Sequence, residues 1–179
     1  MSTLEVNKLT PLADNGTVTL GDSGDTITVP SGVTITNNGT QTGFGGTNTP
    51  NFDVRLSGNF GLTNDTFVKV TWDSETFDSD SAFASNKFTV PSGKAGKYFF
   101  VGKARMVNTT GYIMLEFYKN GSNAGIQFRS QSYSTTYESA IVTAILNLSV
   151  GDYIELYGMQ VSGSANDLTS KLFQGYKLT

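Results

Sequence analysis

Hydrophobic and polar residues alternate along most of the second half of the chain, with turn residues between the alternating segments. A period of two residues indicates strands, in which every second side chain lies on the same face. Turn signals recur about every 8–12 residues, which is typical of an antiparallel sandwich. No segment has a convincing helical period. The expected strands are residues 53–57, 66–72, 97–107, 113–119, 124–130, 138–148, 152–160 and 172–179, with tight turns at Asn120-Gly121 and Gly151-Asp152.

Two of these strands are apolar on both faces. In strand 97–107, Tyr98 and Phe100 lie on one face, and Phe99 and Val101 lie on the other. A sandwich core covers one face only, and exposing the other would forgo several kcal/mol at about 25 cal/mol per Å². We expect a second subunit to cover it; the alternative is a monomer whose loops cover these positions. The residues expected in the subunit interface or core are Phe99, Val101, Ile141, Ile145, Phe173 and Tyr176.

The first 50 residues have a different pattern. Short segments of alternating Thr and β-branched residues at 17–20, 26–29 and 33–36 predict strands separated by Gly, Asp and Pro turns. Three strands of this length cannot bury a core alone, so we expect a stalk in which several copies pair. The alternative is a flexible tail. The predicted organisation is a β-rich stalk or attachment segment over residues 1–50, ending in a Gly/Pro linker, and a head domain over residues 51–179.

Aromatic residues, Gly and Pro recur in a fixed order from Phe52 to Tyr176, and the run ILNLSVGDYIEL occupies residues 145–156. The ordered residues are Phe52, Val54, Phe77, Asp78, Phe88, Pro91, Gly96, Tyr98, Phe100, Ser170, Phe173, Gly175 and Tyr176. This order resembles the globular head of the first complement component and its tumour-necrosis-factor relatives. The resemblance implies an all-β, antiparallel jelly-roll sandwich that forms a homotrimer, binds partners and catalyses nothing. The chain departs from that pattern by extra residues between Phe77 and Phe88.

The N-terminal segment carries a second resemblance. The pattern LEVNKLTP followed by TVTLGDSGDTITVPSGVTITNNGT is similar to the opening of marine phage tail-fibre and virion proteins. This similarity implies a bacteriophage structural protein, such as a tail-fibre tip or virion appendage, that is assembled in the host cytoplasm and located in the virion. Its N-terminal segment would contact other virion or tail proteins, and its head would bind a host-surface glycan or protein. The alternatives are a non-viral bacterial or secreted adhesin and, third, a glycan depolymerase.

The composition limits the kinds of catalytic and metal-binding site that the chain can form. The chain has no His and no Cys, which excludes triads, metal sites and redox sites that depend on them. Its net charge is −3 without a Lys/Arg cluster, so nucleic acid is not an expected partner. No apolar run suits a signal peptide or membrane insertion. Carboxylates at Asp73, Glu75, Asp78 and Asp80 are the only candidates for glycan hydrolysis or for Ca²⁺. We expect neither catalysis nor a cofactor there, although Ca²⁺ is possible.

The direction of successive strands predicts where a partner would bind. Because strands alternate in direction, every second loop lies at the same end of the sandwich. The compact loops 91–96, 119–123 and 148–152 should share the stalk side. The longer loops 108–112, 131–137 and 161–170 should share the opposite end, and they carry Tyr, Ser and Asn, which are common in binding loops. The expected receptor contacts are Tyr112, Tyr133, Tyr137, Asn166 and Asp167.

Overall fold

The computed structural model describes residues 9, 11, 16–39, 48–107, 110–132 and 137–178. The chain divides into two units, Met1–Phe44 and Gly45–Thr179. The described part of the first unit contains no strand, and its residues are exposed. The segments 17–20, 26–29 and 33–36 are therefore unpaired in a single chain. The prediction that they pair between copies concerns an assembly and stays a prediction.

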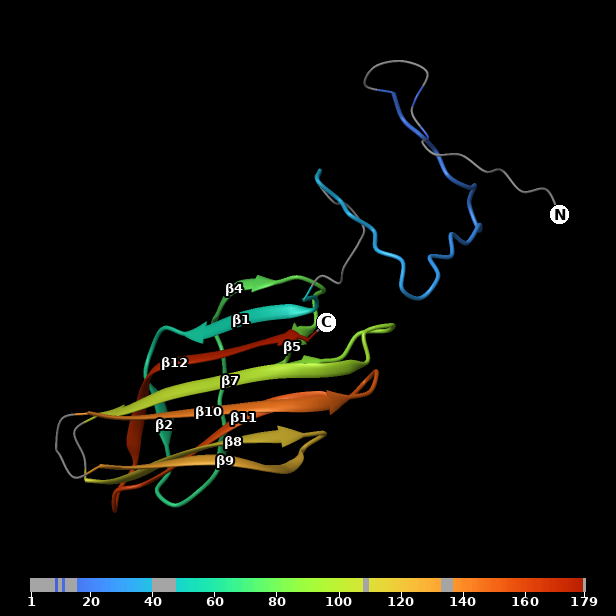
Figure 1. Cartoon of the computed structure of the whole chain (residues 1–179). Coiled ribbons are helices and arrows are strands. Elements are labelled where there is room, and N and C mark those ends of the chain that lie inside the picture. Colours follow the sequence, from blue (N-terminus) through green and yellow to red (C-terminus); the bar gives the residue numbers. More distant parts are fainter. Residues whose placement is uncertain are drawn as a thin grey trace. The chain divides into compact units, whose positions relative to one another are not determined.

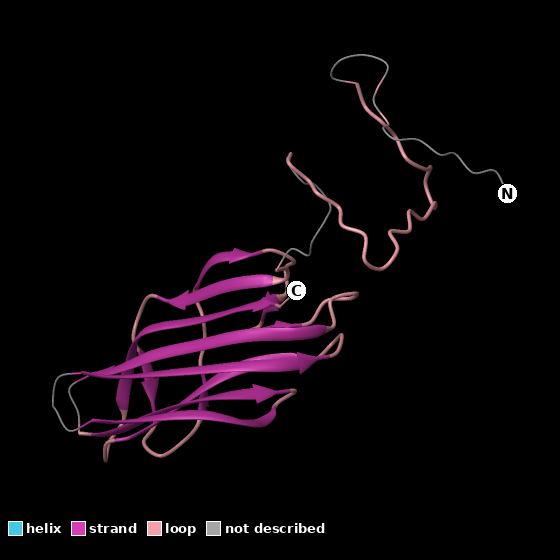
Figure 2. Cartoon of the chain, viewed as in Figure 1, coloured by secondary structure: helices cyan, strands magenta, loops and turns pink. Residues whose placement is uncertain are grey.

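The second unit is a sandwich of two six-stranded sheets (Figures 1 and 2). All pairings between its strands are antiparallel, as the alternating pattern predicted. Sheet A has the order β10 (Tyr137–Leu148), β7 (Gly96–Val107), β12 (Asn166–Lys177), β1 (Asn51–Leu56) and β4 (Ser74–Asp78), and β2 (Phe60–Leu62) also pairs with β12. Sheet B has the order β5 (Phe83–Ala84), β6 (Lys87–Thr89), β11 (Tyr153–Val161), β8 (Gly111–Lys119) and β9 (Ser122–Ser132), and β3 (Val68–Lys69) also pairs with β11. The described residues include no helix that is long and apolar enough to span a membrane.

An aromatic cluster fills the space between the sheets. The Phe52 ring lies 5.1 Å from the Phe88 ring and 4.9 Å from the Phe173 ring, measured between centroids. All three side chains are buried. Gly175 is required beside them, because a Cβ at this position would lie 2.5 Å from Cδ1 of Phe100. Most aromatic residues of the ordered pattern therefore lie in the core of the head, whereas Phe77 and Tyr176 are exposed.

The hairpin predicted at Asn120-Gly121 is confirmed. β8 ends at Lys119 and β9 begins at Ser122, so these two residues form the whole connection. Their φ angles are +53° and +77°, as a tight hairpin of this kind requires. The connection sets the pairing of Lys119 with Ser122 and of Tyr118 with Asn123, and a register shift between Phe117 and Tyr118 separates these pairs from the rest of the ladder.

Three predicted boundaries are wrong. The strand expected over 66–72 is reduced to Val68–Lys69; the Val70 N–H still donates to the Leu156 carbonyl of β11, but that of Trp72 donates to the Asn86 side chain. The segment 161–170 is not one loop, because β12 already begins at Asn166. The region between Phe77 and Phe88, to which the sequence pattern assigned no strand, contributes parts of β4, β5 and β6.

Candidate functional site

The strand registers define the two ends of the sandwich. Val107 pairs with Tyr137, and Tyr112 pairs with both Val161 and Gln131. The connections β7–β8, β9–β10 and β11–β12 therefore lie at one end, called the far end from here on. At the other end, the near end, the Val90 N–H donates to the Asp152 carbonyl and the Asn120 N–H donates to the Tyr153 carbonyl. This sorting of the loops is the one that strand direction predicted.

A polar depression of about 600 Å³ lies on sheet A at the far end. Three of the predicted receptor contacts line it: Tyr137, Asn166 and Asp167. The other lining residues are Asn59, Arg105, Val107, Ser164, Ala165 and Thr169. This group is called the far-end depression below.

The side chains of the far-end depression are held by contacts with one another. The Arg105 guanidinium lies 4.2 Å above the Tyr137 ring centroid, and its Nε donates to Oγ1 of Thr169 at 3.2 Å. On the other side, Asn59 Nδ2 donates to Oδ2 of Asp167 at 3.0 Å. The Asn166 side chain donates to the Val107 carbonyl at 3.2 Å. A cation, an aromatic ring and a carboxylate are thus fixed around one hollow.

The remaining predicted contacts lie elsewhere or outside the description. Tyr112 is on sheet B, where the Arg129 guanidinium stacks 4.0 Å from its ring centroid. Tyr133 lies outside the described residues. Asn166 and Asp167 belong to strand β12, paired with Leu62 and Gly61, rather than to a loop. The binding-site prediction itself stays a prediction, since no ligand is present to test it.

Sequence reasoning missed Arg105, Asn59 and Thr169. Arg105 could have been found, because it has the same strand parity as Phe99 and Val101 and therefore shares their outer face. Asn59 and Thr169 gave no comparable signal. Asn59 reaches the site because it precedes β2, a strand that the sequence did not predict. Thr169 reaches it beside a register shift in β12 between Thr169 and Leu172.

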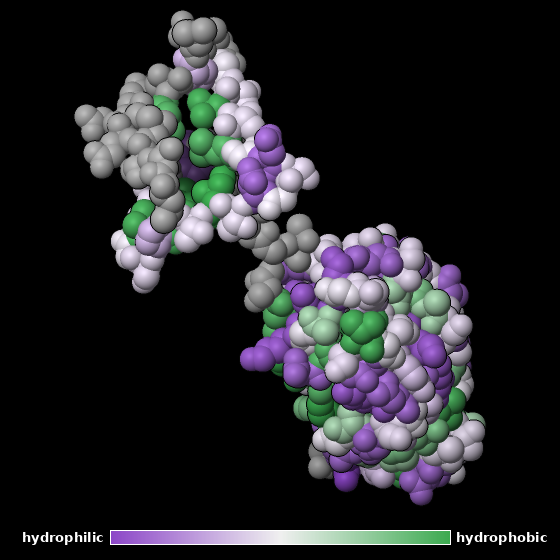
Figure 3. All heavy atoms as spheres, turned by 90° about the vertical axis from the view of Figure 1, so that its right-hand side faces the viewer, coloured by the Kyte–Doolittle hydropathy of each residue, from purple (hydrophilic) through white to green (hydrophobic). Residues whose placement is uncertain are grey.

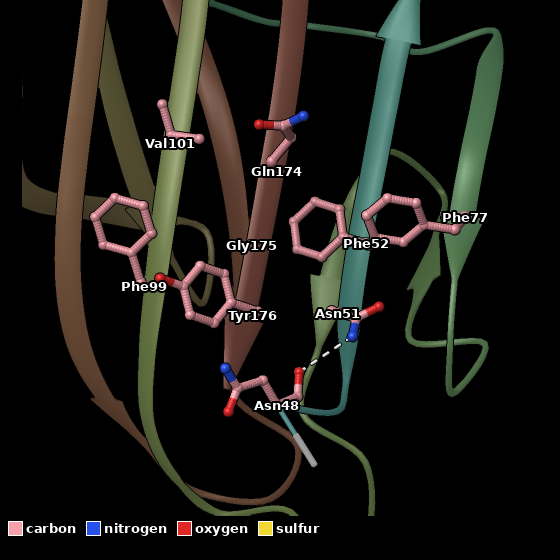
Figure 4. Close-up of a pocket in the computed structure, with 9 residues that line it drawn as sticks. All are labelled: Asn48, Asn51, Phe52, Phe77, Phe99, Val101, Gln174, Gly175 and Tyr176. Carbon is pink, nitrogen blue, oxygen red and sulfur yellow. Dashed lines mark hydrogen bonds between the residues drawn. The ribbon is translucent and has the colours of Figure 1, made fainter. Parts of the chain in front are cut away.

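The outer face of sheet A also carries apolar side chains, gathered toward the near end. Ile145, Phe99 and Tyr176 are neighbours across β10, β7 and β12. The Phe99 and Tyr176 rings lie 5.6 Å apart, beside a shallow hollow of about 490 Å³ (Figure 4). The residues that line this hollow are Asn48, Asn51, Phe52, Phe77, Phe99, Val101, Gln174, Gly175 and Tyr176.

Exposure divides the predicted interface or core residues into two groups. Phe173 is buried in the core between the sheets. Ile145 is 63% exposed, Ile141 48% and Tyr176 38%, and Phe99 and Val101 are partly exposed on the same face. The outer face of sheet A thus changes along its strands, from apolar toward the near end to polar at the far end.

Three of the four carboxylates of the segment 73–80 have structural partners, and the fourth, Glu75, is exposed. The carboxylate of Asp73 accepts hydrogen bonds from Ser57, which hold its pKa below the ordinary value. The Asp78 carboxylate accepts the N–H groups of Ala82 and Phe83. Lys94 lies 3.5 Å from Asp80. Among the described residues, no group of three Asp, Glu, His or Cys side chains is arranged to hold a metal ion.

No protein-family model matches the chain, and no curated protein matches it. Solved structures do match. The globular domain of the zebrafish complement 1qA protein has a TM-score of 0.52 and 20% identity, over 73% of this chain and 98% of that one. Murine APRIL at pH 5.0 has a TM-score of 0.56 and 12% identity, over 72% and 98%. Eiger TNF from S. frugiperda has a TM-score of 0.51 and 19% identity, over 72% and 90%. The fold is therefore a two-sheet antiparallel sandwich of the complement/TNF type, as the sequence resemblance predicted.

Proposed function

We propose that this chain is a non-enzymatic binding module that works as a homotrimer. The observation that carries the proposal is the exposed apolar half of sheet A, on which Ile141, Ile145 and Tyr176 lie beside Phe99. A soluble protein rarely leaves such a face in water, and a second copy of the chain is its natural cover. Folds of the complement/TNF type usually form homotrimers, which supports the same assembly.

The division of sheet A gives each half of the face a role in this proposal. The apolar half joins the subunits, and the far-end depression remains available to a partner. Threefold symmetry then presents three copies of the depression in one direction. Sites that bind singly at millimolar affinity, about −4 kcal/mol, gain about 10²-fold or more when they engage together.

We further propose that the module is a bacteriophage tail-fibre tip or virion appendage that binds a receptor on the host surface. The similarity of the N-terminal pattern to phage fibre proteins supports this role. The apolar side chains of residues 16–39 also support an assembled stalk, since they are exposed in a single chain (Figure 3). A bacterial or secreted adhesin with the same head is the alternative, and a glycan depolymerase is the third candidate.

Three experiments test the assembly, the virion role and the binding site separately. Sedimentation of the purified chain should give a mass three times 19.2 kDa. A mass near that of one subunit would refute the proposed trimer. For the virion role, the head should be located in a density map of the phage particle. Replacing Tyr133 and Tyr137 by Ala should weaken adsorption to host cells while the trimer still forms. Unchanged adsorption in that variant, with loss on altering loop 119–123, would move the binding site to the near end.

A further inference from the structure

The far-end depression combines groups that proteins seldom leave without partners. Arg105 forms no ion pair with a carboxylate of the described residues, although the chain has more acidic than basic residues. Its Nε is bonded to Thr169, and no described residue accepts a hydrogen bond from its terminal nitrogens. Arg55, on the same sheet, is by contrast paired with Asp53 at 2.9 Å. The terminal N–H groups of Arg105 are therefore held in direction by the Thr169 contact, and no described residue accepts from them.

The opposite side of the depression offers acceptors and amides. One oxygen of Asp167, Oδ2, accepts from Asn59, while no hydrogen bond from a described residue reaches Oδ1. Asn166 anchors its amide nitrogen on the Val107 carbonyl. Tyr137 is 53% exposed, so much of its ring remains accessible in addition to the face that Arg105 covers. A ligand here meets a planar cation, an exposed ring and oxygen acceptors within one hollow.

We propose that the far-end depression binds an acidic saccharide, that is, a sugar unit that bears a carboxylate. A carboxylate matches the planar fork of Arg105 and accepts two parallel hydrogen bonds from it. The sugar hydroxyls donate to Asp167 and accept from Asn59, and the apolar face of the ring packs on Tyr137. This assignment rests on the proposed function as a binding module and adds the class of its ligand.

The chemistry of the lining favours a sugar over a protein epitope. Tight protein contacts depend on apolar and aromatic anchors that enter a desolvated pocket. Here the lining is mainly amide, hydroxyl and charged groups, and Tyr137 is the one aromatic ring among its described residues. The volume of about 600 Å³ is within the usual range for small-ligand sites. Weak single-site binding suits a repeating surface polysaccharide, because three depressions can engage one chain together.

The test compares D-glucuronate with D-glucose, which differ at C6 by the carboxylate. Binding of each sugar to the full-length protein is measured by saturation-transfer NMR at millimolar concentrations. The wild-type protein should prefer glucuronate by about tenfold, the effect of a charge-assisted hydrogen-bonded pair. Arg105→Gln should remove this preference, and Arg105→Lys, which retains the charge without the planar fork, should keep part of it. Asp167→Asn should weaken both sugars and leave their ratio unchanged.

Arg129→Gln is the matched control, because Arg129 also stacks on a Tyr ring but lies on sheet B, outside the depression. It should leave both affinities unchanged. Equal binding of the two sugars, no saturation transfer to either sugar, or a preference that survives Arg105→Gln would overturn the proposal. Sedimentation and host adsorption of the same preparations separate this failure from failure of the binding module. If the protein is a trimer whose adsorption depends on Tyr137 but which does not prefer glucuronate, the binding-module proposal stands and the acidic-saccharide proposal is refuted.

Discussion

Tyr118 and Tyr157 stack with ring centroids 3.8 Å apart on neighbouring strands of sheet B. Glu116 lies directly opposite Tyr157 in the register, and both of its carboxylate oxygens are buried without a hydrogen-bond partner among the described residues. Lys69 pairs with Glu155 on the same sheet at 2.6 Å, and no such cation reaches Glu116. The outer face of sheet B thus holds one paired and one unpaired carboxylate.

Glu116→Gln should stabilise the protein at neutral pH by about 1 kcal/mol, since it removes an unpaired buried charge. Burial raises the pKa of Glu116 above its ordinary value of 4.5. Between the unfolded and the folded pKa, the folded state therefore holds a proton that the unfolded state has lost. The penalty is absent below the unfolded pKa, grows as pH rises through the interval up to the raised folded pKa, and is complete above it.

Denaturant unfolding at several pH values measures this difference. The gain from Glu116→Gln should disappear at pH values below the ordinary carboxyl pKa. Glu75→Gln is the control, because Glu75 is exposed on β4 and should show no comparable effect. A gain from Glu116→Gln that is equal at acidic and neutral pH would contradict the buried ionised state.

Gly175→Ala should destabilise the head by about 3 kcal/mol, because overpacking a filled core forces its neighbours to move. The added Cβ would lie 2.5 Å from Phe100 and 2.8 Å from Phe52, both rigid rings in the centre of the core. Gly58→Ala is the matched control, since a Cβ there meets nothing within 4 Å. Thermal unfolding of both variants checks the prediction, and equal melting temperatures would refute the packing argument.

Ile145→Glu should shift the assembly toward single subunits, because it places a charge in the proposed subunit contact. Val150→Glu is the control: Val150 is similarly exposed, at 53%, but lies in the turn after β10. Sedimentation at micromolar concentration measures the mass of each variant. An unchanged mass for Ile145→Glu would show that subunits meet elsewhere than on this half of sheet A.

Deleting residues 1–42 should lower the thermal stability of the trimer and leave the head folded. The reason is that Ile27 and Ile35 are 62% and 61% exposed in a single chain and gain cover only through assembly. Circular dichroism reports the strand content, and the melting temperature reports the assembly. An unchanged melting temperature would identify the segment as a tail or attachment peptide instead of a stalk.

The core of the head was predictable because its strands follow a strict period. Even-numbered residues of β7 are buried, from Tyr98 to Met106, and β10 buries Ala140 and Val142 while exposing Ile141. Alternation also fixes which loops share an end. These features depend only on strand parity and direction, which the sequence records directly.

The short strands, the start of β12 and the members of the far-end depression could not be predicted, because they depend on contacts between residues far apart in sequence. β2 and β3 contain three and two residues, too few to show a period. The start of β12 was hidden by the register shift near Ser170, whose φ is +47°. Arg105 was not assigned to a site, because its partners Thr169 and Tyr137 are far from it in sequence.

The two ends of the sandwich differ in how much sequence change they can absorb. At the near end, Asp152 accepts hydrogen bonds from Asn120 and Ser149 and pairs with Lys119 at 2.8 Å, so its loops constrain one another. At the far end, the last pair of the long β7–β10 ladder is Val107 with Tyr137, and the connecting loops begin beyond it. Insertions in those loops would leave the ladder intact. If the far end binds a receptor as proposed, a lineage can change that end of the head and inherit the rest of the sandwich unaltered.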